Sequence, residues 1–235
     1  MAESEVESLY PGRAIAAAAI EAGRRLFARE ARFVAGAADA SALPVESLPE
    51  IAFAGRSNVG KSSLVNALTR RRMLARTSNT PGRTRQLNFF DLGRALMLVD
   101  LPGYGYAEAS KSAIANWTAV TLHYLRSRSG LRRVCLLIDA RHGIKDPDRP
   151  MLRLLDQAGV SYQVVLTKID KLRAAELSAT AERVAAELSA HVAAHPEIHL
   201  TSAEKDRGVA ALRATIAELI SPHPEAAMPE PGASP

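Results

Sequence analysis

The chain has 235 residues, of which 47% are hydrophobic and 23% charged, so it can form one globular domain with a substantial core. Cys135 is the only cysteine and lies in an apolar run, which excludes a disulfide framework and favours a small core residue over a catalytic thiol. No apolar run approaches the roughly 18 residues that span a bilayer, and residues 1–12 are acidic where a secretory signal would be basic. We therefore expect a cytoplasmic protein that does not bind a membrane.

The formal net charge is +5, and the basic residues gather in a few places. Charge runs are common on solvated faces, but this clustering favours a polyanionic partner. Aromatic residues make up 5% of the chain and are too scattered to predict a platform of stacked bases. The clustered residues are Arg70, Arg71, Arg72, Arg76, Arg83, Arg85, Arg126, Arg128, Arg132 and Arg133.

The two ends of the chain differ from its middle. Residues 1–12 are predicted to be disordered, residues 14–30 have a helical pattern, and residues 31–36 are predicted as an additional edge strand. Pro44 and Pro49 interrupt the chain before the next apolar strand, so we treat residues 1–50 as an N-terminal extension. The proline-rich residues 221–235 lack periodic apolar positions and are predicted to be a disordered, flexible tail.

Between these ends, residues 51–220 alternate strands with helices and form the predicted nucleotide-binding domain. The expected strands are 51–55, 84–90, 95–100, 134–139, 162–167 and 197–201, and the expected helices are 61–69, 111–128, 147–157, 174–194 and 207–220. Continuous Val, Leu and Ile strands that alternate with helices are typical of a mostly parallel sheet with helices on both faces. A hairpin-like turn joins 84–90 to 95–100, so the sequence predicts an α/β fold with a six-stranded sheet and one antiparallel strand pair.

Residues 55–62 read GRSNVGKS and lie between an apolar strand and a helical pattern. This is the spacing of a phosphate-binding loop, in which glycines let backbone N–H groups curl around phosphate oxygens at the start of a helix. Lys61 is expected to reach the β- and γ-phosphates, and Ser62 to ligate Mg²⁺. The predicted nucleotide-binding residues here are Gly55, Arg56, Ser57, Asn58, Val59, Gly60, Lys61 and Ser62.

A second contact is expected at DLPG, which follows the apolar strand 95–100. Asp100 is predicted to hold Mg²⁺ through water, and the Gly103 N–H to meet the γ-phosphate. An Asp followed by Pro-Gly is also a common turn, but its place about 40 residues after a phosphate-binding loop favours the nucleotide role. The predicted segment is Asp100, Leu101, Pro102 and Gly103.

The base is predicted to be read by TKID at the end of the strand 162–167. The Asp170 carboxylate can accept hydrogen bonds from N1–H and the exocyclic amine of guanine, whereas adenine offers no such donor pair. An unpaired carboxylate would cost roughly 1–3 kcal/mol, which selects GTP over ATP. Lys168 is expected along the plane of the base, and the N–H groups of Ser202 and Ala203 are expected to face the guanine oxygen. The predicted set is Thr167, Lys168, Ile169, Asp170, Ser202, Ala203 and Glu204.

Four segments together resemble the EngB family of bacterial GTPases, which is also called YihA or YsxC: GRSNVGKSS, TSNTPGRTRQLNFF, DLPGYGYA and LTKID. This family is part of the TrmE-Era-EngA-EngB-septin-like superfamily. The resemblance covers residues 51–220 and implies a Ras-like P-loop GTPase domain. It also implies GTP- and Mg²⁺-dependent assembly of the large (50S) ribosomal subunit, whose precursor rRNA and ribosomal proteins would be partners. A link to cell division and septation is implied as well.

The resemblance also implies a switch segment. The Thr84 hydroxyl is expected to complete the Mg²⁺ shell when GTP is bound, although Thr77 and Thr80 compete for this role on spacing alone. EngB proteins, like this chain, have Thr at the position of Thr167, where many GTPases read the base with Asn. The segment expected to close over the nucleotide is Gly82, Arg83, Thr84, Arg85 and Gln86.

The residue that drives hydrolysis is unknown from the sequence. Ras-type enzymes orient the attacking water with a Gln directly after D-x-x-G, and Tyr104 stands at that position here. We therefore expect slow intrinsic GTPase activity, with Lys61 and Asn58 stabilising the transition state. Asn58 occupies a position where several related GTPases coordinate K⁺, but asparagine also tolerates a tight turn, so a K⁺ cofactor stays open.

Three functions fit these residues. The first is a monomeric GTP-dependent switch in assembly of the large ribosomal subunit. The second is the GTPase module of an RNA-modification system, which would need another catalytic domain or partner. The third is a constitutive tether that uses GTP as a structural ligand. The complete set of phosphate and guanine motifs beside arginine-rich loops favours the switch.

Overall fold

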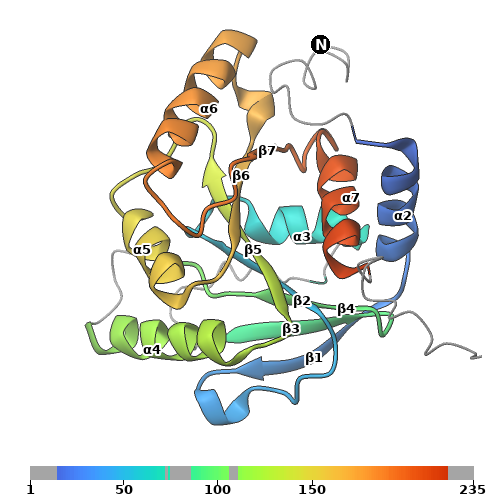
Figure 1. The fold of residues 1–235 in the computed structure, drawn as a ribbon, viewed down its shortest axis with the longest axis vertical. Helices are drawn as coiled ribbons and strands as arrows, with labels where there is room; N and C mark the ends of the chain where they lie inside the picture. The colour runs from blue at the N-terminus through green and yellow to red at the C-terminus, as the bar shows by residue number, and fades with distance from the viewer. Residues whose placement is uncertain (1–14, 72–73, 75–85, 106–110, 222–235) are drawn as a thin grey trace, which may run out of the picture.

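The computed structural model describes residues 15–71, 74, 86–105 and 111–221, which form one seven-stranded sheet flanked by helices (Figure 1). The strands are β1 (Ala31–Ala37), β2 (Glu50–Gly55), β3 (Leu87–Leu92), β4 (Leu96–Asp100), β5 (Leu131–Asp139), β6 (Tyr162–Thr167) and β7 (His199–Leu200). The α-helices are α2 (Ala17–Phe27), α3 (Lys61–Thr69), α4 (Lys111–Ser127), α5 (Arg149–Ala158), α6 (Ala174–Leu188) and α7 (Val209–Ile220). Two 3-10 helices are η1 (Ala40–Ala42) and η2 (Ile169–Lys171). No helix in this described part is long and apolar enough to cross a bilayer.

The strands lie in the order β1-β3-β4-β2-β5-β6-β7. Parallel pairing joins β2 to β4 and β5, β5 to β6, and β6 to β7, whereas β3 pairs antiparallel with both β1 and β4. The predicted mostly parallel α/β sheet and its hairpin are therefore confirmed. The predicted count of six strands is corrected to seven, because the edge strand expected near 31–36 joins the same sheet by pairing with β3.

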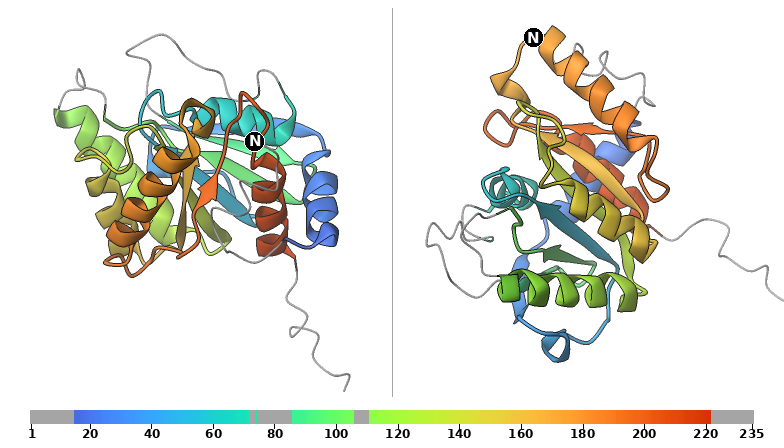
Figure 2. Two further views of the ribbon diagram at one scale, coloured as in Figure 1. Left: turned by 90° about the horizontal axis from the view of Figure 1, so that it is seen from above. Right: turned by 90° about the vertical axis from the view of Figure 1, so that its left-hand side faces the viewer.

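Two apolar cores lie on opposite faces of the sheet (Figures 1 and 2). One contains side chains of α4, α5 and α6, and the other contains side chains of α2, α3 and α7. Strand β2 contributes to both, because Ala52 and Ala54 point into the first core while Ile51 and Phe53 point into the second. A strand buried on both faces is held firmly, and this fixes the loop that follows it.

Helices α2 and α7 lie side by side (Figures 1 and 2). Their backbones approach closely at Gly23, where an added Cβ would lie only 2.6 Å from the Ala214 nitrogen. Leu26 and Phe27 of α2 are buried in the same core as α7. The segment before residue 51 is therefore packed against the rest of the domain through both α2 and β1.

Helix α6 ends at Leu188 rather than at residue 194, where the helical pattern predicted its end. The chain beyond it turns back to the sheet, because the Tyr162 N–H donates to the Ala193 carbonyl at 3.0 Å and the His195 N–H donates to the Tyr162 carbonyl at 2.7 Å. These two bonds hold residues 193–195 beside β6, in place of a further helical turn. The apolar period predicted the helix but not this competing partner.

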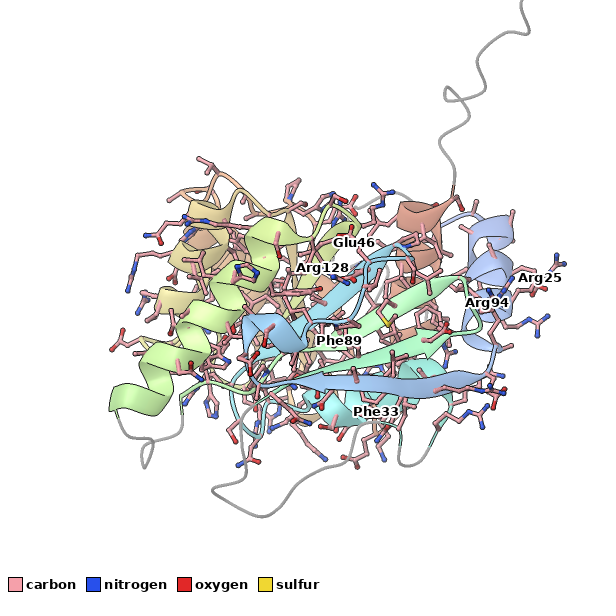
Figure 3. All side chains as sticks on the ribbon, turned by 90° about the horizontal axis from the view of Figure 1, so that it is seen from below. Arg25, Phe33, Glu46, Phe89, Arg94 and Arg128 are labelled. Carbon is pink, nitrogen blue, oxygen red and sulfur yellow. The ribbon has the colours of Figure 1, made fainter. Side chains whose placement is uncertain are left out.

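A buried ionic network fastens the start of β2 to α4. Glu50 is 1% exposed, accepts a hydrogen bond from the Tyr124 hydroxyl at 2.9 Å, and is paired with Arg128. The Arg128 guanidinium also donates to the Pro44 carbonyl at 2.8 Å and lies over the Phe89 ring (Figure 3). Removing one partner of such a pair would leave an uncompensated buried charge.

Candidate functional site

The loop between β2 and α3 holds the first group of predicted site residues. Gly60 has φ = 103°, a left-handed conformation that glycine adopts without strain, and Asn58 has φ = 64°. At Gly55 a Cβ would lie 2.9 Å from Cγ1 of Val59. Glycine is therefore needed at both ends of this loop, which leads into α3, where the N–H groups of a first helical turn have no intrahelical partners and can bind an anion.

Parallel pairing brings the end of β4 to the same edge, where Asp100 is in register with Phe53. The Lys61 ammonium donates to the Asp100 carboxylate, and their side chains are 11% and 13% exposed. Two motifs separated in the sequence thus meet in the structure. Ser62 follows Lys61 in α3, and the Ser62 hydroxyl and Asp100 carboxylate are the hard oxygen donors that suit Mg²⁺.

The DLPG segment lies alongside the phosphate loop through backbone bonds. The Leu101 N–H donates to the Phe53 carbonyl at 2.9 Å, and the Ser57 N–H donates to the Tyr104 carbonyl at 3.0 Å. A Cβ on Gly103 would lie 3.3 Å from the Ser57 nitrogen, so glycine allows this close approach. The predicted γ-phosphate contact is therefore placed next to the loop that would hold the phosphates.

Tyr104 stands where Ras-type enzymes have their water-orienting Gln, and it is 6% exposed. Its hydroxyl donates to the Asp148 carboxylate at 3.0 Å, and its ring packs near Trp117. Burial, reinforced by the nearby Asp148 carboxylate, raises the pKa of Tyr104 well above its usual value. The hydroxyl thus stays protonated and is engaged with Asp148.

The segment predicted to read the base, residues 167–170, is hydrogen-bonded to the predicted phosphate-binding loop, residues 55–62. The Thr167 hydroxyl donates to the Val59 carbonyl at 2.7 Å, and the Lys168 ammonium donates to the Asn58 carbonyl at 2.7 Å. The Thr167 side chain is 4% exposed, and although it is short it reaches the Val59 carbonyl. The two predicted halves of the site hold each other in place.

The Asp170 carboxylate is prepared to accept hydrogen bonds. Its Oδ1 accepts from the Ser202 hydroxyl at 2.6 Å, whereas Oδ2 is buried and has no hydrogen bond within the described residues, although the Lys171 ammonium lies 3.1 Å away. Burial acts to raise the pKa of Asp170, but the Ser202 and Lys171 contacts outweigh it and lower the pKa. The group is therefore an anion whose Oδ2 faces the Lys171 ammonium and has no other partner within the described residues.

One predicted role is wrong in detail. The Ser202 N–H, expected to face the guanine oxygen, donates instead to the Arg207 carbonyl at 2.9 Å. This bond forms because residues 202–207 make a tight turn in which the Arg207 N–H also donates back to Ser202. Ser202 orients Asp170 through its hydroxyl, and the role predicted for Ala203 stays a prediction. Glu204 forms an exposed ion pair with Lys171 at 2.8 Å.

Comparison with known proteins decides the family. Residues 50–168 match the family model described as "50S ribosome-binding GTPase", and residues 123–222 match the elongation factor Tu GTP binding domain. A probable GTP-binding protein EngB of Rhodospirillum rubrum is 60% identical over 212 residues, covering 88% of this chain and 92% of that protein. Another from Hyphomonas neptunium is 54% identical, covering 86% and 93%.

The chain belongs to the EngB family of GTP-binding proteins. The predicted family is thus confirmed, and with it the predicted GTPase activity. The crystal structure of a probable GTP-binding protein EngB aligns with a TM-score of 0.56 at 24% identity, covering 73% of this chain and 98% of that one. The GTPase Era, in complex with MgGDPNP and a 16S ribosomal RNA fragment, aligns with a TM-score of 0.58 at 23% identity, covering 79% and 61%. These two structures support the fold alone.

Three of the segments predicted to form the site of this EngB family member lie at the carboxyl ends of β2, β4 and β6. They are residues 55–62, 100–103 and 167–170. The predicted switch threonines and residues 82–85 lie outside the described residues. Gln86 is described, and its side chain lies over Gly36 of β1 and donates to Asn88 at 3.1 Å. Its predicted part in closing over the nucleotide stays a prediction.

Sequence reasoning missed Asp139, which ends β5 at the same edge. Its carboxylate accepts from the Lys168 ammonium at 2.9 Å and from the Arg141 guanidinium at 2.7 Å. Burial opposes the effect, but these bonds hold the pKa of Asp139 well below its usual range. The sequence did contain a signal for Asp139, because this residue ends an apolar strand as Asp100 does.

A hollow of about 220 Å³ opens beside Asp139. It is lined by Arg56, Ser57, Asn58, Val59, Asp139, Arg141, His142, Gly143, Asp148 and Lys168.

Proposed function

We propose that this EngB family member is a GTP-dependent switch in assembly of the large ribosomal subunit, acting as a cytoplasmic monomer and needed for normal cell division and septation. The observation that carries the proposal is the convergence of a phosphate loop, a magnesium-type donor set and a buried carboxylate suited to guanine. The match to a family described as "50S ribosome-binding GTPase" supports the ribosomal partner.

The phosphates would be held by the backbone amides of the β2–α3 loop and by Lys61. Ser62, Thr84 and Asp100, the last through water, would hold Mg²⁺, which supplies neutralisation of the charge on the phosphate oxygens. Lys61 is paired with the Asp100 carboxylate. A triphosphate offers that cation a second anionic partner.

Guanine would be read by Oδ2 of Asp170, which lies beside the Lys171 ammonium, and by the Ala203 N–H. Asp170 is an anion held by the Ser202 hydroxyl, so it accepts hydrogen bonds without first losing a proton. Adenine presents no donor to this oxygen, so the hydrogen bond that guanine would make is lost. The Ser202 hydroxyl would therefore sharpen selectivity by positioning Asp170.

Hydrolysis is expected to be slow, because the Tyr104 hydroxyl is bonded to Asp148 instead of orienting a water. Lys61 and Asn58 remain our candidates for stabilising the transition state. Asn58 has a positive φ, which asparagine tolerates well, so its conformation alone does not require an ion. If Asn58 holds K⁺, single-turnover hydrolysis will be faster in potassium than in sodium, and equal rates would remove K⁺ from the mechanism.

The decisive test is co-sedimentation of the full chain with precursors of the large ribosomal subunit, loaded in parallel with GDP and with a non-hydrolysable GTP analogue. We expect binding to depend on the nucleotide, and a Lys61→Met variant to lose that dependence because it lacks the phosphate-binding cation. Equal binding with both nucleotides would favour the constitutive tether. Absence of binding together with co-purification of an RNA-modifying enzyme would favour the second alternative.

A further inference from the structure

The outer strand of the sheet carries an exposed apolar pair. β1 pairs with β3 on one side and forms the end of the strand order. Phe33 is 58% exposed and the adjacent Val34 is 46% exposed. Only two other large apolar side chains in the described part of the chain, Val45 and Val192, are comparably exposed. An exposed aromatic beside an exposed valine on an edge strand is costly in water, so it points to a partner.

The fold does not need Phe33 in this exposed position. Its ring meets the edge of the Phe90 ring at a centroid distance of 5.8 Å, which leaves most of its surface in solvent. The pairing register with β3 shifts between Phe33 and Ala35. This irregularity exposes Arg32, Phe33 and Val34 in succession, and it interrupts the regular edge that an added peptide strand would extend.

Positive charge surrounds this strand. Arg29, which precedes β1, donates to the Gly93 carbonyl at 3.0 Å, and Arg94 follows in the same hairpin turn. Figure 3 shows Phe33 on β1 and, toward the end of the strand near α2, Arg94 and Arg25. This region contains six exposed arginines and three carboxylates. The arginines are Arg24, Arg25, Arg29, Arg32, Arg71 and Arg94, and the carboxylates are Glu21, Glu30 and Asp91.

We propose that β1 and its arginines form a docking surface for single-stranded RNA, with one base stacked on Phe33 and phosphates bound by the arginines. The charge excess suits a polyanion, and a single exposed aromatic ring suits one unstacked base. The arginines combine charge with planar donors that match phosphate oxygens. The inference rests on the proposed function, since it names where a ribosomal precursor would be touched and by which component.

The test uses the full chain with Mg²⁺ and a non-hydrolysable GTP analogue, titrated into a fluorescein-labelled single-stranded RNA of mixed sequence. Phe33→Ser is compared with Val192→Ser, which removes a 92% exposed side chain elsewhere. The double variant Arg32→Gln/Arg94→Gln is compared with Arg153→Gln/Arg183→Gln, two exposed arginines of α5 and α6 away from β1. Calorimetry with the GTP analogue verifies that each variant is folded.

Phe33→Ser is expected to weaken RNA binding by about 5- to 150-fold, the range that loss of one stacked base produces. The β1 arginine variant is expected to reduce the slope of log Kd against log salt concentration by about 1.4, because two phosphate contacts are lost. The two control variants are expected to change affinity by less than about twofold.

Equal affinity of Phe33→Ser and its control would overturn the proposal. The proposal would also be overturned if Phe33→Ser lost binding only to ribosomal-precursor proteins from which the RNA had been removed. In that case β1 would bind a peptide. If every variant sediments with ribosomal precursors as the parent does, the β1 surface is wrong and the proposed function stands. If the parent binds RNA through Phe33 yet ignores the precursors, the proposed function is wrong and the β1 surface stands.

Discussion

Replacing Asp170 by Asn tests whether the carboxylate reads the base. The amide keeps one acceptor oxygen but presents an N–H donor where guanine presents another donor. One charge-assisted hydrogen bond is lost, worth about 1.5–3 kcal/mol, so the affinity for GTP should fall by roughly 10- to 150-fold. Oδ2 is buried, and the Lys171 ammonium 3.1 Å away is its partner within the described residues, so Asn would also lose this ion pair.

The same substitution should improve binding of xanthosine triphosphate. Xanthine carries an oxygen in place of the exocyclic amine, so the Asn amide can donate to it while its oxygen accepts from N1–H. Calorimetry with both nucleotides and Mg²⁺ measures the exchange of preference. Asp206→Asn is the matched control, because this neighbouring aspartate is exposed and has a positive φ that asparagine tolerates.

The reasoning fails if Asp170→Asn and Asp206→Asn bind GTP with equal affinity. It also fails if Asp170→Asn loses both nucleotides to the same extent while urea unfolding shows an unchanged fold. In that case Asp170 would support the loop through Ser202 and Lys171 without contacting the base. A reversed preference between guanine and xanthine has no such structural explanation.

Three further changes test the rest of the structure. Arg128→Ala leaves Glu50 buried without its cation and should lower the free energy of unfolding by about 3–5 kcal/mol in urea, whereas Arg126→Ala, on an exposed part of α4, should change it by less than about 0.5 kcal/mol. Tyr104→Phe should cost about 1–2 kcal/mol of stability yet leave single-turnover GTP hydrolysis within about threefold, and a hydrolysis loss of roughly a hundredfold would show a catalytic role. Burial lowers the pKa of His199 from 6.5 to about 4, so the unfolded chain binds more protons between those values. Stability should therefore fall by up to about 3 kcal/mol as the pH drops from 7 to 4, and an unchanged slope in His199→Gln would contradict this assignment.

The phosphate loop was predictable because its chemistry is local. Gly60 needs a left-handed backbone, and Lys61 and Ser62 need only the next helical turn, so eight consecutive residues specify the geometry. Asp100 and Asp170 were predictable for a related reason, since Asp100 ends β4, Asp170 lies three residues after the end of β6, and the ends of parallel strands share one edge of the sheet. The pairing of the strands then brings Asp100 and Asp170 to the same edge of the sheet as the loop.

The errors came from contacts between distant segments. The end of α6 depends on a partner strand at Tyr162, and helical periodicity carries no information about that partner. The Ser202 N–H was assigned from its place after a strand, but the turn to Arg207 uses it. The edge strand β1 was expected, whereas the surface formed by Phe33 and arginines from three elements became visible only when the chain folded.

The arrangement of the site also limits where a switch can act. Thr167 and Lys168 bind the backbone of the β2–α3 loop directly, so the segment that we propose reads guanine is held to this loop by protein contacts. GDP and GTP share the base and the first two phosphates, and these groups cannot distinguish the two states. Only the end of the loop near Lys61, Asp100 and Gly103 would meet the additional phosphate. In the proposed switch, a nucleotide-dependent change would therefore begin where the γ-phosphate meets Lys61 and Asp100, and it would leave in place the segment that we propose reads the base.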